Sequence, residues 1–294
     1  MQGTKNIVGR AAFALLALGW LVIPAIAEPP VLPDDVRENV VQRVDDKFSA
    51  SVVIGMVNAD GVVYFAHGTT ALSGGVTPDE NTVYEIGSIS KVFTGTLLAD
   101  MVEKGTVALE DPVARHLPDE VSVPARGETP IRLVDLATHR SGLPRMPDNV
   151  DPADPLNPYA DYTVEDLYEF LGSHELARDV GEGHEYSNLG MGLLGHVLER
   201  ISGKTYEQLV GERIAGPLGM ASTGITLTPE LKERMVRPHA MTIEVEPWDI
   251  PTLAGAGALR STAKDMVAFL AANMGLRVQA GLKSLEVHSC HNAR

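Results

Sequence analysis

Two Ser-x-x-Lys patterns each place a hydroxyl nucleophile three residues before a lysine. On a helix, side chains at positions i and i+3 lie on one face, so the lysine amine can take the proton of the hydroxyl. The first pattern is Ser88-Ile89-Ser90-Lys91 and the second is Ser261-Thr262-Ala263-Lys264. Because about one such match is expected by chance in a chain of this length, the pattern alone is weak evidence of catalysis.

The sequence around the two patterns separates them. Ser88 follows a glycine and opens an apolar stretch, where the N-terminus of a helix would favour negative charge developing beside it. Lys91 precedes an apolar pair, and desolvation there would lower its pKa towards that of a useful base. In the second pattern Thr262 and Asp265 fit a capping box, which predicts a helix N-cap with a solvated lysine. For Ser88 alone, an ordinary N-cap with a surface lysine is equally compatible with the sequence.

A third pattern, Tyr186-Ser187-Asn188, is the only Tyr-x-Asn in the sequence and directly precedes an apolar helical stretch. A tyrosine beside a lysine ammonium has a lowered pKa and can relay protons. The amide of Asn188 can donate to a substrate carbonyl or to Lys91. The alternative is a turn tyrosine followed by Asn188 as the helix N-cap.

The elements that must position these residues follow from periodicity and turn signals. Ser51 to Val57 and Val62 to His67 are rich in β-formers and flank Asp60-Gly61, which predicts a hairpin. A helix with an apolar face that includes Val92 is predicted from Ser88 to Lys104, ended by Gly105. Further helices are predicted at 36–48, 131–138, after the Thr163–Asp166 capping box, and at 189–201, 205–214 and 262–274, and prolines predict a loop over 144–158.

Three further segments carry a family resemblance. They are Leu136-Ala137-Thr138-His139-Arg140-Ser141-Gly142-Leu143-Pro144, Gly216-Pro217-Leu218-Gly219-Met220, and Ala254-Gly255-Ala256-Gly257 leading to Leu259-Arg260-Ser261-Thr262. Together with the Ser88 and Tyr186 patterns, and in the same order, they resemble the serine β-lactamase and penicillin-binding-protein superfamily over about residues 36 to 275. The similarity is to its class C β-lactamase-like branch, which includes D-Ala-D-Ala carboxypeptidases, endopeptidases and some esterases.

The resemblance implies an α+β fold of the β-lactamase/DD-peptidase type, with an antiparallel sheet and a helix-rich region. It implies a serine acyl-enzyme mechanism on a β-lactam or a peptidoglycan stem peptide, without metal or organic cofactor. Ser88 would attack the carbonyl, Lys91 and Tyr186 would accept and return protons, and Asn188 would orient the substrate. The Ser88 backbone N–H would form half of an oxyanion hole. The alternatives are an esterase on the same fold, and a truncated form that binds without catalysis.

One part of the family pattern is missing. The third motif, Lys-Thr/Ser-Gly or His-x-Gly, does not occur after residue 188. In the family its strand pairs with the hairpin and supplies the second oxyanion donor, so we expect residues 28–294 to form a serine hydrolase domain that lacks C-terminal strands, as after a truncation or frameshift near residue 276. Since losing one oxyanion donor costs about 3–4 kcal/mol, we expect much weaker activity than in a full-length relative. His288, Cys290 and His291 are more typical of an unrelated terminus than of a metal site.

Composition and the N-terminus define the remaining expectations. The 294 residues carry 24 basic and 39 acidic side chains, a net charge of −15, which argues against nucleic-acid binding. The single cysteine excludes an intramolecular disulfide. Residues 1–27 combine Lys5 and Arg10, an apolar run and Ala25-Ile26-Ala27, which predicts a cleaved signal peptide, with an uncleaved anchor as the alternative. We therefore expect a periplasmic or secreted protein, without stable membrane insertion after cleavage.

Overall fold

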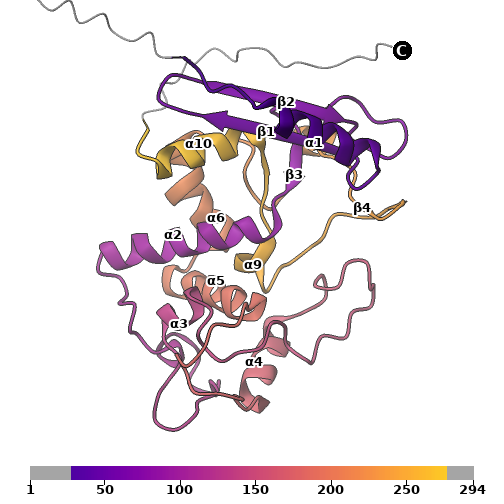
Figure 1. Cartoon of the computed structure of the whole chain (residues 1–294). Coiled ribbons are helices and arrows are strands. Elements are labelled where there is room, and N and C mark those ends of the chain that lie inside the picture. The colour runs from indigo at the N-terminus through magenta and orange to yellow at the C-terminus, as the bar shows by residue number, and fades with distance from the viewer. Residues whose placement is uncertain (1–27, 277–294) are drawn as a thin grey trace, which may run out of the picture.

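A computed structural model describes residues 28–276, with a β-hairpin at one end of the molecule and helices through the rest (Figure 1). The hairpin consists of β1 (Ser51–Val57) and β2 (Val62–Gly68), which pair antiparallel with Ile54 opposite Phe65. The hairpin prediction is therefore confirmed. The mixture of helices and antiparallel strands is also the α+β class expected from the sequence.

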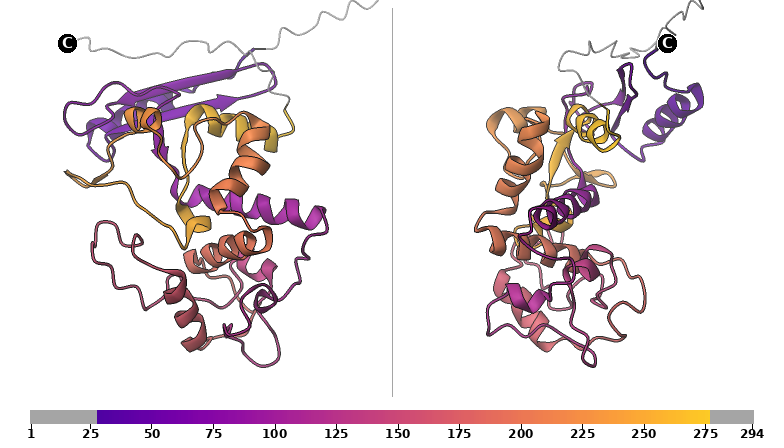
Figure 2. Two further views of the ribbon diagram at one scale, coloured as in Figure 1. Left: turned by 180° about the vertical axis from the view of Figure 1, so that it is seen from behind. Right: turned by 90° about the vertical axis from the view of Figure 1, so that its left-hand side faces the viewer.

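Two helices cover opposite faces of the hairpin, which Figure 2 shows edge-on in its right-hand view. Side chains alternate between the faces of a strand, so Phe65 packs with α1 (Asp34–Asp45) while Tyr64 packs against Val267 of α10 (Ala263–Asn273). Gly55 lies on the α10 face, where a Cβ atom would come within 2.4 Å of the Val267 side chain. The absence of a side chain at this position lets α10 approach β1 closely.

The main core is helical and lies below the hairpin in Figure 1. Its centre is formed by α2 (Ser90–Glu103) and α5 (Asn188–Ser202), with the short α9 (Ala254–Gly257) packed against both. A Cβ atom added at Gly195 of α5 would lie 2.9 Å from the Cα atom of Gly255 in α9. This close backbone approach is what brings the α9 segment next to the N-terminal end of α2.

The other predicted helices are present with shifted boundaries, whereas the strands at 83–85, 239–240, 243–244 and 260–262 were not predicted from the sequence. The helix predicted at 205–214 is an α-helix over Tyr206–Val210 that continues as a π-helix over Gly211–Ala215. The Thr163–Asp166 capping box opens α4 as expected. Two short antiparallel ladders, β3–β6 and β4–β5, complete the strand pairing among the described residues. The bounds are β3 (Val83–Glu85), η1 (Gly87–Ile89), η2 (Val113–His116), α3 (Leu133–Ala137), α4 (Val164–Ser173), α6 (Tyr206–Val210), η3 (Gly211–Ala215), α7 (Gly216–Leu218), α8 (Pro229–Arg234), β4 (His239–Ala240), β5 (Ile243–Glu244) and β6 (Arg260–Thr262).

One predicted core position of α2 is wrong. Val92 was expected on the buried face of the helix, but its side chain is 51% exposed, whereas its neighbour Phe93 is fully buried and stacks on Phe269. Val92 faces an apolar groove of about 710 Å³ between β1, α2 and α10. Over residues 28–276, β1 has β2 as its only strand partner. The predicted signal peptide and the terminal residues His288, Cys290 and His291 lie outside the described residues.

Candidate active site

The structure brings together the four side chains singled out in the sequence. Ser88 lies in the η1 turn directly before α2, and Lys91 lies in the first turn of that helix. Lys91 Nζ donates to Ser88 Oγ at 3.1 Å, and the hydroxyl of Tyr186 donates to the same oxygen at 2.7 Å. Lys91 Nζ also donates to Oδ1 of Asn188 at 2.9 Å. Because Ser88 is exposed while it makes these contacts, a substrate carbonyl can reach its oxygen.

Lys91 is held by three acceptors in a buried position. Besides Ser88 and Asn188, its Nζ donates to the backbone carbonyl of Ala256 in α9 at 2.6 Å. Burial lowers the pKa of Lys91, its contact with Tyr186 partly opposes this, and the positive charge of Arg145 lowers it further. The amine is therefore easier to deprotonate than an exposed lysine. The sequence could not identify Ala256 as a partner, because a backbone carbonyl leaves no side-chain pattern.

The phenol of Tyr186 has opposing influences on its acidity. Burial raises its pKa, but its contacts with Lys91 and Ser88 and the charges of Lys91 and Arg145 outweigh burial and lower it. The ammonium of Lys91 lies 4.8 Å from the centre of the tyrosine ring, and the guanidinium of Arg145 lies 5.1 Å from it. Two cations beside one ring favour the phenolate, so Tyr186 is placed to exchange protons with Ser88.

His139 supports the tyrosine loop and was not identified from the sequence. Its Nδ1 accepts a hydrogen bond from the backbone N–H of Ser187 at 3.1 Å, and its ring lies 4.7 Å from the ring of Tyr186. Its backbone has a φ of 58°, a left-handed conformation that non-glycine residues rarely adopt. Burial, then the neighbouring His184 and Lys91, lower the pKa of His139. His139 lies within the segment that carries the family resemblance, but no local pattern announces the left-handed backbone.

Ser187, rather than Asn188, caps helix α5. Its Oγ accepts from the N–H of Gly190 at 2.8 Å and donates to the carbonyl of Pro144 at 2.6 Å. The alternative interpretation of Asn188 as the N-cap is therefore wrong. The amide of Asn188 faces Lys91 through its oxygen, which accepts, whereas the sequence suggested that it would donate to the lysine.

The second Ser-x-x-Lys pattern is a helix cap, as predicted. Oγ1 of Thr262 accepts from the N–H of Asp265 at 3.2 Å and caps α10, while Lys264 is exposed. Ser261 is fully buried, with its hydroxyl 2.7 Å from that of Thr223. The carboxylate of Asp265 accepts from the N–H of Ser222 instead of completing the box. A substrate has no access to Ser261, so this pattern carries no catalytic site.

A small apolar cavity of about 90 Å³ adjoins Ser88. Tyr159 and Trp248 form one side of it, with ring centres 5.3 Å apart and planes inclined at 74°. We call these two residues the aromatic wall. The other residues that line the cavity are Gly87, Met146, Asn188, Ile250, Leu253, Ala256 and Gly257.

The part of the chain that the structure describes has neither a cluster of metal-binding side chains nor a membrane-spanning helix. Between residues 28 and 276, no group of three or more His, Cys, Asp or Glu is arranged to hold a metal ion. In that same part of the chain, no helix combines the length and apolar character needed to cross a bilayer.

Known proteins resemble this chain over most of its length. The sequence model of the Beta-lactamase family matches residues 36–289. The chain belongs to the Beta-lactamase family. It is 31% identical over 267 residues to the D-alanyl-D-alanine-carboxypeptidase/endopeptidase AmpH of Escherichia coli K12, covering 87% of this chain and 67% of AmpH. It is 26% identical to a β-lactamase of the same strain, covering 89% of this chain and 64% of that enzyme.

Solved structures of similar proteins share the fold. A β-lactamase/D-alanine carboxypeptidase from Yersinia pestis, complexed with citrate, superposes with a TM-score of 0.65 at 28% identity, covering 80% of this chain and 68% of that one. A β-lactamase from Sulfitobacter sp. EE-36 gives a TM-score of 0.70 at 27% identity, with 84% and 65% covered. This Beta-lactamase family chain therefore has the β-lactamase/DD-peptidase fold and spans about two thirds of the length of these relatives.

Proposed function

We propose that this protein is a serine hydrolase that forms an acyl-enzyme on β-lactams or D-Ala-D-Ala peptides. The observation that carries the proposal is the exposed Ser88 oxygen, which lies 3.1 Å from Lys91 Nζ and 2.7 Å from the hydroxyl of Tyr186. Relatives named as β-lactamases and as a D-alanyl-D-alanine carboxypeptidase/endopeptidase support this class of substrate. Both substrate types present an amide carbonyl to one nucleophile.

In the acylation step, Ser88 Oγ adds to the carbonyl carbon and its proton passes to the Lys91–Tyr186 pair. The lowered pKa of each partner favours its deprotonated form as acceptor. The Ser88 N–H, in the η1 turn directly before α2, donates to the oxyanion that forms. When the tetrahedral intermediate collapses, the C–N bond breaks and the leaving nitrogen takes the proton back from the pair.

Deacylation uses the same groups in reverse order. Water adds to the ester carbonyl and gives a proton to the Lys91–Tyr186 pair, and the ester C–O bond then breaks. Ser88 recovers its proton, and the carboxylic acid leaves. Throughout, Asn188 and the carbonyl of Ala256 hold the lysine amine in place. Asn188 also lines the cavity beside Ser88, so its amide is placed to orient a substrate there.

The proposal is tested by covalent labelling with a fluorescent penicillin. We expect residues 28–294 to form a covalent adduct, detected by mass spectrometry as added mass on the proteolytic peptide that contains Ser88. The S88A variant should form none. S261A is the matched control, since it removes the serine of the other Ser-x-x-Lys pattern and should label normally. Labelling that survives S88A, or a wild-type protein that never labels, overturns the proposal. A durable adduct indicates a peptidase, and rapid turnover indicates a lactamase.

An esterase on the same fold is the second candidate. The cavity beside Ser88 is apolar and holds about 90 Å³, which suits a small apolar acyl group. Cleavage of short p-nitrophenyl esters, lost in S88A and without any penicillin adduct, would favour this candidate over the first.

We also propose that the protein is exported to the periplasm or secreted, on the basis of the signal-like residues 1–27. Expression in a Gram-negative host followed by fractionation tests this. We expect the mature N-terminus at Glu28 in the periplasmic fraction or the medium. Retention of residues 1–27 on a membrane-bound protein would contradict cleavage.

A further inference from the structure

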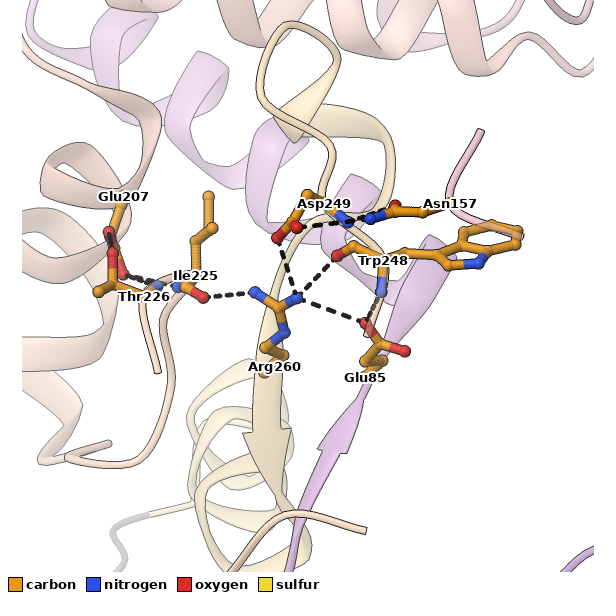
Figure 3. A network of polar contacts seen from close by, with 8 residues as sticks. All are labelled: Glu85, Asn157, Glu207, Ile225, Thr226, Trp248, Asp249 and Arg260. Carbon is orange, nitrogen blue, oxygen red and sulfur yellow. Dashed lines mark hydrogen bonds and ion pairs between the residues drawn. The ribbon is translucent and has the colours of Figure 1, made fainter. Parts of the chain in front are cut away.

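Arg260 is a buried cation at the centre of a polar network (Figure 3). Its side chain, on β6, is only 6% exposed. Nη1 donates to the carbonyl of Ile225 at 2.5 Å, and Nη2 donates to the carbonyl of Trp248 at 2.7 Å. The carboxylates of Glu85 and Asp249 lie 3.5 and 3.7 Å from Nη2. One guanidinium therefore joins two loops to the β3–β6 ladder.

The network fixes the backbone of Trp248 on both sides. Arg260 binds its carbonyl, and Oε1 of Glu85 accepts from its N–H at 2.8 Å. Outside this pair, the indole Nε1 donates to the carbonyl of Leu156, and the N–H of Asp249 donates to Oδ1 of Asn157. The position of the indole therefore depends on buried Arg260 and half-buried Glu85, which bind its backbone, and on the carbonyl of Leu156, which binds its ring.

Trp248 is also half of the aromatic wall of the cavity beside Ser88, whereas Arg260 does not line that cavity. An indole and a phenol ring at 5.3 Å present flat apolar surfaces, against which a planar apolar group packs favourably. Since a lysine at position 260 would offer one compact ammonium in place of a planar fork with two separated donors, it could not satisfy both carbonyls in the same way.

We propose that Arg260 is a positioning residue that holds Trp248 in the aromatic wall, and that this wall selects substrates with an aromatic acyl side chain. The inference rests on the proposed acyl-enzyme function for its substrate, but not for the positioning itself. A change at Arg260 should affect the wall through Trp248, because the guanidinium binds the Trp248 carbonyl and so helps to place the indole.

The positioning is tested without any substrate. The chain has two tryptophans, Trp20 and Trp248, so in residues 28–294 the tryptophan fluorescence, excited selectively over that of tyrosine, comes from Trp248 alone. We expect R260K to raise the acrylamide quenching constant of Trp248 about twofold, while R234K, at another partly buried arginine bonded to a backbone carbonyl, leaves it unchanged. Equal quenching in wild type and R260K would overturn the positioning role.

The selectivity is tested with benzylpenicillin and 6-aminopenicillanic acid, which share a nucleus but differ in the aromatic side chain. We expect W248A and R260K each to lower the acylation efficiency with benzylpenicillin about tenfold or more, and to leave that of 6-aminopenicillanic acid within about twofold. The double variant should be no more impaired in selectivity than W248A. An equal loss with both substrates would show a merely structural role and overturn the proposal.

A second variant and the quenching comparison cover the cases in which R260K does not fold or the protein is not acylated. If R260K does not fold, E85Q replaces it, because it removes the charge that faces Arg260 while keeping an acceptor for the N–H of Trp248; unchanged quenching and selectivity in E85Q would then count against the network. If no β-lactam acylates the wild-type protein, the proposed function and the selectivity fail together, and the quenching comparison still decides the positioning role.

Discussion

Replacing His139 by asparagine and by alanine separates two contributions of its ring to stability. Oδ1 of asparagine occupies nearly the place of the histidine Nδ1, so H139N keeps an acceptor for the N–H of Ser187 but loses the ring. H139A loses both. Asparagine also tolerates the φ of 58° at this position better than alanine does.

The magnitudes follow from the contacts. Ser187 is buried, and leaving its N–H without the acceptor that now lies at 3.1 Å costs about 1–3 kcal/mol. Loss of the packing between the rings of His139 and Tyr186 costs about 0.5–1.5 kcal/mol. We therefore expect the free energy of unfolding to fall by about 1 kcal/mol in H139N and by about 2–4 kcal/mol in H139A.

The same variants test the protonation of His139. Its folded-state pKa is lowered below 6.5, so as the pH falls through about 6.5 the unfolded chain binds a proton before the folded protein does. The stability contributed by the neutral ring is therefore full above this pH and is lost as the pH falls towards the lowered pKa. H139N lacks this loss.

Urea unfolding followed by circular dichroism, at about pH 8 and about pH 5.5, measures both effects. If H139N is as unstable as H139A, the acceptor contributes nothing to stability and the predicted difference is wrong. A stability difference between wild type and H139N that is the same at both pH values would contradict the predicted protonation of His139.

Three further predictions concern the site. Y186F should acylate about 10²–10⁴-fold more slowly than wild type while remaining folded, measured by labelling with a fluorescent penicillin; a rate within about twofold of wild type would exclude the phenol from proton transfer. Wild-type acylation should rise with pH as the Lys91–Tyr186 pair, in which both pKa values are lowered, becomes free to accept the proton of Ser88. K91R should acylate far more slowly at every pH, because arginine keeps its proton and leaves only Tyr186 as acceptor. Gly195→Ala should lower the free energy of unfolding by about 1–3 kcal/mol, because its Cβ would lie 2.9 Å from the Cα of Gly255; an unchanged urea midpoint would show that α9 can move away without cost.

The local elements were predictable because their signals are local. The hairpin followed from alternating β-formers around Asp60-Gly61, and α4 from its capping box. Gly105 and Gly203 end their helices with left-handed backbones, as glycine after a helix predicts. The Ser88 and Tyr186 patterns likewise pointed to a common site, although they lie far apart in the sequence.

What the sequence could not supply depends on contacts between distant segments. The exposure of Val92, the carbonyl of Ala256 beside Lys91, and the ring of His139 beneath Tyr186 leave no periodic trace in the chain. Ser187 is the N-cap in place of Asn188, and its hydroxyl also binds the carbonyl of Pro144, which lies 43 residues earlier in the chain.

The sequence by itself therefore determined which chemical groups are present, the order in which they occur, and the approximate positions of the hairpin and of the main helices. The tertiary structure decided how far apart those groups lie, which of them are buried, and in which direction their pKa values shift. Distances and desolvation arise when segments from different parts of the chain pack together, and it is these that turn a serine, a lysine and a tyrosine into a candidate catalytic site.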